Sequence, residues 1–357
     1  MKRFSIADCP CPTAQRGRRG LPIGPRRIFA CVLVLGLLLS PLAVEAQQAG
    51  KTSRIAFVHY PARLSPVALA GLEALRHGLR DLGWIEGKDF VIELRLAESE
   101  AKLPEMSAQV VREKFDLIVL GNTLVAMAIK EATTTIPVVM TGACDPVECG
   151  VVGGNLARPG GNITGATIIT SEVAGKRIEF LKEMVPGLTQ VAALPYGHDT
   201  FCVRVVWLTK SETTARALGL TLQRPKLDPV MSADQWDAAF AALKKDGVGA
   251  VTVMEGPIYG IQAPQIAAAA LKYRLPTVFP SRAQVEAGGL VSYGADQISL
   301  FQRGAYFVDR ILRGAKPGDL PIEQPTKFDL LINGKTAKAL GLTIPPSLLM
   351  RGAEVIE

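Results

Sequence analysis

Histidine is scarce in this chain of 357 residues, which contains His59, His77 and His198 and no others. Catalytic motifs are missing as well, because no Gly-x-Ser-x-Gly elbow, paired metal motif or phosphate-binding glycine loop occurs. His198 and Cys202 are four residues apart, but a zinc site needs further ligands and no second pair is present. The sequence therefore predicts that the protein is not an enzyme and has no metal or other cofactor.

Residues 47–357 have almost no excess of basic over acidic residues. The whole chain has 40 Lys and Arg against 33 Asp and Glu, a net charge of +7. Seven of the basic and two of the acidic residues lie within residues 1–46, which leaves 33 basic and 31 acidic residues. Residues 47–357 contain no Lys/Arg cluster of the kind that neutralises phosphates, so the sequence argues against a nucleic-acid partner.

Cysteine is also rare in the main part of the chain. Three of the six cysteines lie within residues 1–46, and Cys144, Cys149 and Cys202 remain. Three cysteines do not make a disulfide framework. Cys144 and Cys149 could pair locally in an oxidising compartment, but the favoured interpretation is small buried or loop thiols.

The longest apolar run near the N-terminus, Ile28–Leu39, has 12 residues and is too short to span about 30 Å of hydrocarbon. Arg26 and Arg27 precede the run, and the segment that follows it ends in a small-residue cleavage site at Ala46. This pattern is typical of a secretory signal peptide, so we expect export to the periplasm and cleavage near Ala46. The arginine pair leaves the twin-arginine route open, although an ordinary secretory signal is favoured.

Residues 47–357 are enough for two domains of ordinary size. Strands and helices alternate from a strand over 54–59 to a strand over 136–140, and the almost wholly apolar segment 115–120 is typical of a buried parallel strand. A proline and three glycines within 157–165 predict a connection. Alternation restarts with a helix over 172–185, so the pattern predicts two successive α/β units with parallel sheets.

Several segments resemble the solute-binding proteins of ABC transporters, and in particular the receptors for tryptophan and other aromatic amino acids. The resemblance covers the chain from about residue 52 to its end, and the strings Arg-Pro-Gly-Gly-Asn and Gln-Pro-Thr-Lys-Phe are its most specific parts. The segments that carry it are 82–87, 157–165, 175–177, 288–294, 311–316, 320–328 and 335–346.

The resemblance implies an α/β, type I periplasmic-binding fold of two Rossmann-like lobes. It places three interlobe crossings near 161–166, 288–294 and 321–327. Lobe 1 would then comprise residues 52–162 plus 292–322, and lobe 2 residues 163–289 plus 325–357. The resemblance further implies an extracytoplasmic component of an ABC importer that captures a small organic solute, an amino acid or aromatic acid, by hinge closure and delivers it to an ABC permease in the membrane. We expect a monomer. A sensing module for a membrane signalling partner would have the same fold and stays an alternative.

Ligands of open parallel sheets bind outside the carboxyl ends of the strands. Tyr60 and Ser65 follow the first strand, Asn122 and Thr123 follow the third, and Asp145 follows the fourth. Each is a candidate ligand-binding residue with a structural alternative. Tyr60 could pack on its own lobe, Asn122 and Thr123 suit a helix N-cap, and Asp145 could cap a helix beginning at Pro146.

The second α/β unit offers a further set of candidates on the other wall of the cleft. Relatives often have an Asn-Pro-containing loop where this chain has Tyr-Gly-His-Asp, so the identity of the solute stays open. The candidates are Tyr196, His198, Asp199, Glu255, Arg282 and Tyr293.

Overall fold

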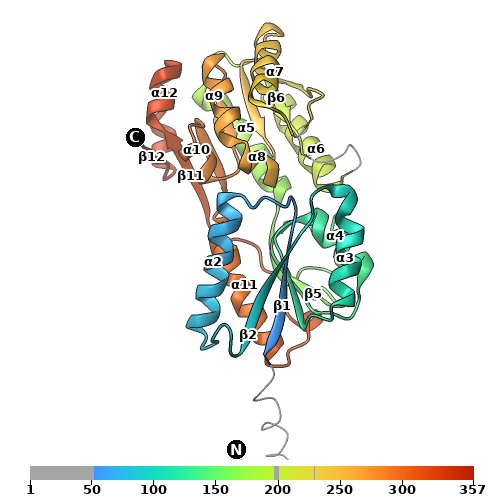
Figure 1. Ribbon diagram of the computed structural model, residues 1–357. Coiled ribbons are helices and arrows are strands. Elements are labelled where there is room, and N and C mark those ends of the chain that lie inside the picture. Colours follow the sequence, from blue (N-terminus) through green and yellow to red (C-terminus); the bar gives the residue numbers. More distant parts are fainter. Residues whose placement is uncertain (1–51, 197–200, 229) are drawn as a thin grey trace, which may run out of the picture. The chain divides into compact units, whose positions relative to one another are not determined.

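Two β-sheets with helices around them make up the fold in the computed structural model (Figure 1). The structure describes residues 52–196, 201–228 and 230–357. The expected signal peptide and two candidate residues, His198 and Asp199, lie outside the described residues. Within the described ranges, no helix combines the length and apolar character that crossing a bilayer requires.

The first lobe is a five-stranded parallel sheet in the order β2-β1-β3-β4-β5. All four residues of β3 are fully buried, as the apolar run predicts. Phe57 on β1 and Phe301 on α11 pack in the core between the sheet and the helices α2 and α11. The elements are β1 (Ser53–His59), α2 (Pro66–Asp81), β2 (Phe90–Leu96), α3 (Leu103–Arg112), β3 (Leu117–Leu120), α4 (Thr123–Ala132), β4 (Val138–Cys144), β5 (Ile163–Ile168) and α11 (Gln297–Leu312), with a short 3₁₀ turn at Glu100–Lys102.

The second lobe is a seven-stranded sheet in the order β12-β11-β10-β9-β8-β6-β7. Its core includes the fully buried Trp207 and Trp236 from two of its helices. The strands are β6 (Gln190–Leu194), β7 (Thr221–Gln223), β8 (Ala250–Val253), β9 (Thr277–Phe279), β10 (Val291–Ala295), β11 (Phe328–Asn333) and β12 (Glu354–Ile356). The helices are α5 (Thr170–Met184), α6 (Cys202–Ala217), α7 (Ala233–Lys245), α8 (Pro257–Ile261), α9 (Ala263–Lys272), α10 (Arg282–Glu286), α12 (Gly334–Leu340) and α13 (Pro346–Met350).

The chain passes between the two lobes three times. It leaves the first lobe after β5 to form α5, returns after β10 to form α11, and leaves again after the 3₁₀ turn at Pro317–Asp319 to form β11. Before this last passage, the Glu323 N–H donates to the Gly165 carbonyl and the Glu323 carbonyl accepts from Thr167, both at 2.9 Å. The expected α/β fold of two Rossmann-like lobes is therefore confirmed. The residue limits of each lobe stay a prediction.

The structure corrects several details of the sequence-based prediction. Residues Ile163–Ile168, partly assigned to a connection, form the buried strand β5, in which Gly165 has a φ of +127°. A Cβ atom at Gly165 would stand 2.2 Å from the Met140 carbonyl oxygen of β4, so glycine here permits strand pairing. β10 and β11 pair in antiparallel fashion, because the chain re-enters the second sheet from the first lobe. A short additional helix, α8, precedes α9 in the segment after β8.

Candidate ligand-binding cleft

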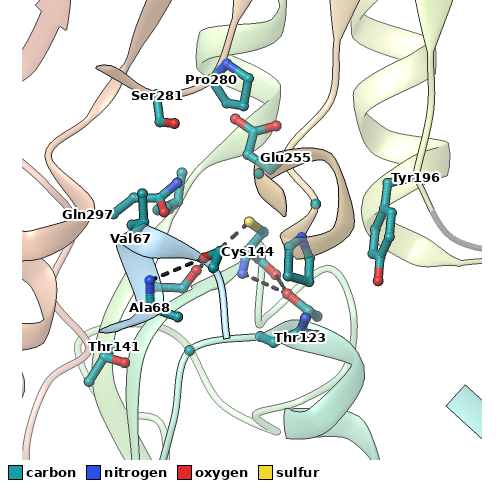
Figure 2. Close-up of a pocket in the computed structure, with 18 of the residues that line it drawn as sticks. Val67, Ala68, Thr123, Thr141, Cys144, Tyr196, Glu255, Pro280, Ser281 and Gln297 are labelled. Atoms are coloured by element: carbon teal, nitrogen blue, oxygen red, sulfur yellow. Dashed lines mark hydrogen bonds between the residues drawn. The ribbon is translucent and has the colours of Figure 1, made fainter. Parts of the chain in front are cut away.

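A cavity of about 120 Å³ lies where the carboxyl ends of strands from both sheets meet (Figure 2). Of the eleven candidate residues, the structure brings five to its wall. Ser65, Asn122 and Thr123 come from the first lobe, and Tyr196 and Glu255 come from the second. The wall also contains Ser281, which the loop over 280–286 was expected to contribute. The other residues of the wall are not among the eleven candidates, namely His59, Val67, Ala68, Gly121, Thr141, Gly142, Cys144, Ile168, Phe201, Val203, Gly256, Pro257, Gly260, Pro280, Gln284, Gln297 and Phe301.

The wall on the first lobe is built around two helix N-termini. Ser65 caps α2, since its hydroxyl accepts from the Ala68 N–H at 3.2 Å. Asn122 caps α4 by accepting from the Leu124 N–H at 2.8 Å. The Thr123 hydroxyl accepts from the Cys144 N–H at 2.7 Å, and this hydrogen bond joins the start of α4 to the end of β4. The two N-termini give this wall a partial positive charge, which suits an anionic group.

The wall on the second lobe contains a carboxylate that is paired with a buried arginine. Glu255 follows β8, and its Oε1 accepts from Arg177 Nη2 at 2.5 Å. The Arg177 side chain is buried, and its Nε also donates to the Tyr293 carbonyl at 2.8 Å. Glu255 Oε2 is buried and has no hydrogen-bond partner. Among the described residues that line the cavity, Glu255 is the one carboxylate, and neither lysine nor arginine joins it.

Aromatic side chains close other parts of the cleft. Tyr196 lines the cavity, and its hydroxyl shares a hydrogen bond with the hydroxyl of the buried Tyr60, which is not itself in the wall. Burial raises the pKa values of both tyrosines above the ordinary value, so both are neutral hydrogen-bonding groups at neutral pH. His59 Nδ1 lies 3.1 Å from the Pro61 carbonyl, and burial lowers the pKa of the imidazole. The histidine in the wall is therefore neutral.

Asp145 lies behind the cavity rather than in its wall. Its carboxylate accepts from the backbone N–H of Thr170, the first residue of α5, and its Oδ2 is buried without a partner. Burial, and next the negative charges of Glu148 and Glu255, raise the pKa of Asp145 to about 7. The expected helix at Pro146 does not form, and residues 146–150 make turns. Asp145 therefore meets the start of α5, where the chain enters the second lobe.

Two candidate residues of the second lobe lie away from the cavity. Arg282, in the first turn of α10, forms ion pairs with Glu286 and Glu354. The Tyr293 ring packs between Phe180 and Phe328, with ring centroids 5.0 and 5.7 Å away. A loop position near a strand end predicted both, but the direction of each side chain depends on neighbours that are distant in sequence.

The cysteines also differ from the expectation of free thiols. Cys149 and Cys202 form a disulfide across a sequence separation of 53 residues, while Cys144 is free and buried. The Cys144–Cys149 pair that the sequence left open is not formed. Spacing could not find the observed pair, because one cysteine follows β4 of the first lobe and the other begins α6 of the second.

Comparison with known proteins identifies the family. The family described as ABC transporter substrate binding protein matches residues 55–356. The chain belongs to this family. It is a family of solute-binding proteins rather than of enzymes, so a substrate-binding role is established for the chain at that general level. The resemblance inferred from the sequence is thereby confirmed.

Individual relatives agree with this assignment. The chain is 25% identical over 268 residues to a tyrosine-binding protein of Clostridioides difficile strain R20291, which covers 74% of each chain. A crystal structure described as an ABC domain in complex with L-Trp from Streptococcus pneumonia has 26% identity and a TM-score of 0.75 over 86% of this chain and all of that one. A conserved domain protein from Vibrio cholerae has 26% identity and a TM-score of 0.77 with the same coverage.

Proposed function

We propose that this protein is the extracytoplasmic solute-binding component of an ABC importer, which captures an aromatic amino acid between its lobes and delivers it to a membrane permease. The observation that carries the proposal is a carboxylate on one cavity wall and two helix N-termini on the other. Glu255 lines the cleft from the second lobe with one carboxylate oxygen that has no hydrogen-bond partner, and the capping residues of α2 and α4 line it from the first.

An α-amino acid matches this pair of walls. Its ammonium group would donate to Glu255 Oε2, and its carboxylate would accept from N–H groups at the starts of α2 and α4, near Ser65, Asn122 and Thr123. The aromatic side chains Tyr196, Phe201 and Phe301 would surround the apolar part of the solute. The tyrosine-binding relative and the neighbour with bound L-Trp support an aromatic solute.

The size of the cavity supports a small solute. Its volume of about 120 Å³ is near the roughly 150 Å³ of an engineered cavity that binds benzene, and below the range of about 300–1,000 Å³ for drug-sized ligands. One ring with a short polar end fits this scale better than an oligosaccharide or a peptide.

Closure of the lobes would follow from contacts to both walls. A ligand shifts a two-state equilibrium only by its differential affinity for the two states. A solute bound to Glu255 and to the α4 N-terminus at once makes all of its contacts only when the lobes are together. The closed form would then dock on the permease, so that the permease receives loaded protein.

Calorimetry tests the proposal directly. Purified protein is titrated with L-tyrosine, L-tryptophan and L-phenylalanine, and thermal unfolding is followed in parallel. We expect at least one of them to bind and, at 100 times its Kd, to stabilise the fold by about 2.7 kcal/mol. Benzoate and phenethylamine each lack one of the two charged groups and should bind more weakly. Absence of binding by every amino acid in a complete panel would overturn the proposal.

A further inference from the structure

The Cys149–Cys202 disulfide connects the two lobes. Cys149 lies in the turns after β4 of the first lobe, and Cys202 is the first residue of α6 in the second. The chain itself joins the lobes three times, after β5, after β10 and before β11, and neither cysteine belongs to these passages. The disulfide is therefore a fourth covalent connection, formed between side chains.

Each cysteine is firmly attached to its own lobe. The Cys149 N–H donates to the Asp145 carbonyl at 2.9 Å, and Val151 and Val152 of the same turns are buried at 2% and 5% exposure. On the other side, α6 places Val203 and Trp207 in the core of the second lobe at 2% and 0% exposure. A movement of one lobe relative to the other must therefore act on the disulfide, because neither end can swing away freely.

The disulfide lies beside the ligand cavity. Phe201, the residue before Cys202, is in the cavity wall, as is Cys144 at the end of the strand that leads to Cys149. Other contacts across the cleft are not covalent. Tyr196 and Tyr60 share a hydrogen bond. Helix α2 also meets α8, where the Ser65 Cβ lies 3.6 Å from the position that a Cβ on Gly260 would take. These contacts can separate when the lobes part, whereas the Cα atoms of the two cysteines, 5.3 Å apart, cannot.

We propose that the Cys149–Cys202 disulfide limits the opening of the cleft, so that the ligand-free protein opens by a partial rotation that widens the gap between α2 and α8. The inference rests on the two-lobed closure of the proposed function. The bond forms when the two thiols give up two electrons and two protons to the disulfide of an oxidising thiol–disulfide exchange protein, which becomes a dithiol. Loss of the bond allows the wider opening.

Restricted opening has a consequence for affinity. When only a fraction of a protein is in the form that binds the ligand, the apparent Kd equals the intrinsic Kd divided by that fraction. The disulfide removes widely open states from the ligand-free ensemble, so it should lower the apparent Kd for any solute that binds both lobes. Its reduction should raise the Kd severalfold without changing any residue that contacts the solute.

Small-angle X-ray scattering of the ligand-free protein tests the limit on opening. The samples are the oxidised protein, the same protein reduced with dithiothreitol and alkylated, and the Cys149→Ser/Cys202→Ser variant. Dithiothreitol supplies two electrons and two protons and becomes a cyclic disulfide. We expect a larger radius of gyration in the reduced protein and in the variant, and no further change when the variant is treated with dithiothreitol. Equal radii in all samples would overturn the proposal.

Two further measurements keep the outcome decisive. Peptide mapping without reduction should recover a Cys149–Cys202 linked peptide, and its absence would overturn the proposal. The variant Tyr60→Phe removes a contact across the cleft but keeps the disulfide, so its radius of gyration should equal that of the oxidised protein. Circular dichroism checks that every sample is folded, and reduction of the already folded protein replaces the variant if the variant does not fold.

The scattering experiment contains no solute, so its result is separate from that of the proposed function. A change in radius without binding of any amino acid would contradict the proposed ligand and support the limit on opening. Binding of an amino acid with no change in radius would support the proposed ligand and contradict the limit on opening.

Discussion

Arg177 Nη2 lies 2.5 Å from Glu255 Oε1, and both side chains are largely buried at the second wall of the cleft. Arg177 comes from α5, directly after the first passage between the lobes, and Glu255 follows β8. The ion pair leaves the other Glu255 oxygen without a partner. The pair therefore fixes the position of the one carboxylate among the described residues of the cavity wall.

The variant Arg177→Met should destabilise the protein, because it leaves the Glu255 carboxylate buried without its counter-ion. Breaking a buried pair in this way typically costs about 3–5 kcal/mol. Replacement of both members, Arg177→Met with Glu255→Met, should restore much of that loss. Urea unfolding of the three proteins measures the difference, and a single variant as stable as the parent would contradict the assigned role of the pair.

The variant Glu255→Gln should weaken amino-acid binding about 10- to 100-fold, because a hydrogen bond to a charged group contributes about 1.5–3 kcal/mol. The glutamine carbonyl can still accept from Arg177, so the fold should persist. Titration calorimetry provides the affinities. Glu354→Gln is the matched control, since Glu354 also pairs with an arginine of the second lobe but does not line the cavity. An unchanged affinity in Glu255→Gln would exclude this carboxylate as the ammonium site.

The stability of the ligand-free protein should fall between about pH 4 and pH 7 because of Asp145. Its pKa is raised from 3.8 to about 7, mainly by burial, so the folded protein keeps a proton that the unfolded chain has already lost. Stability decreases with rising pH wherever the folded state binds more protons. Asp145→Asn can still accept from Thr170 and should remove this part of the pH dependence, up to about 4 kcal/mol. Urea unfolding from pH 4 to pH 8 measures it.

Asp234→Asn is the control for that series, because Asp234 lies in the first turn of α7 and is exposed. Its profile should follow that of the parent protein. A profile of Asp145→Asn as steep as that of the parent would mean that another group causes the fall.

The variant Gly165→Ala should disrupt the pairing of β4 and β5. An alanine would adopt a φ of +127° only with strain, and its Cβ would stand 2.2 Å from the Met140 carbonyl oxygen. We expect a loss of about 1–3 kcal/mol or more in the free energy of unfolding. Gly153→Ala is the matched control, because a Cβ there meets nothing within 4 Å and no positive φ is required. Equal stabilities of the two variants would contradict the explanation.

The Cys149→Ser/Cys202→Ser variant should unfold more easily than the oxidised protein. A crosslink restricts the unfolded chain, and for a loop of 53 residues the expected contribution is about 2–4 kcal/mol. Denaturant unfolding with and without dithiothreitol measures it. If the reductant also destabilised the double-serine variant, the effect would not come from this bond.

Local patterns predicted much of the fold. The apolar run of β3 arises from the burial of its own residues, so it is visible in the sequence. β5 was partly missed because its glycine suits a close approach to β4, and in the sequence the same glycine resembles part of a turn. The antiparallel pairing of β10 and β11 depends on the return of the chain, which no local pattern records.

Part of the candidate site was predictable because residues that follow parallel strands lie at the same edge of a sheet. Asn122, Thr123 and Glu255 follow strands directly, so the topology of parallel sheets takes them to the cleft. Phe301 has the spacing of a core residue of α11 and reaches the cavity only because that helix packs beside the end of the first sheet. Ser281 was expected in the cleft wall from its loop after the strand 276–279, and it lines the cavity together with Gln284 at the start of α10.

The return of the chain from α11 to β11 means that neither half of the molecule is one continuous piece of polypeptide. Strands β11 and β12 of the second sheet come from residues 328–356, which follow helix α11 of the first lobe in the sequence. No single cut can release an intact lobe, and a ribosome must synthesise nearly the whole chain before either half has all of its parts. Each half is therefore completed only after the chain has passed through the other.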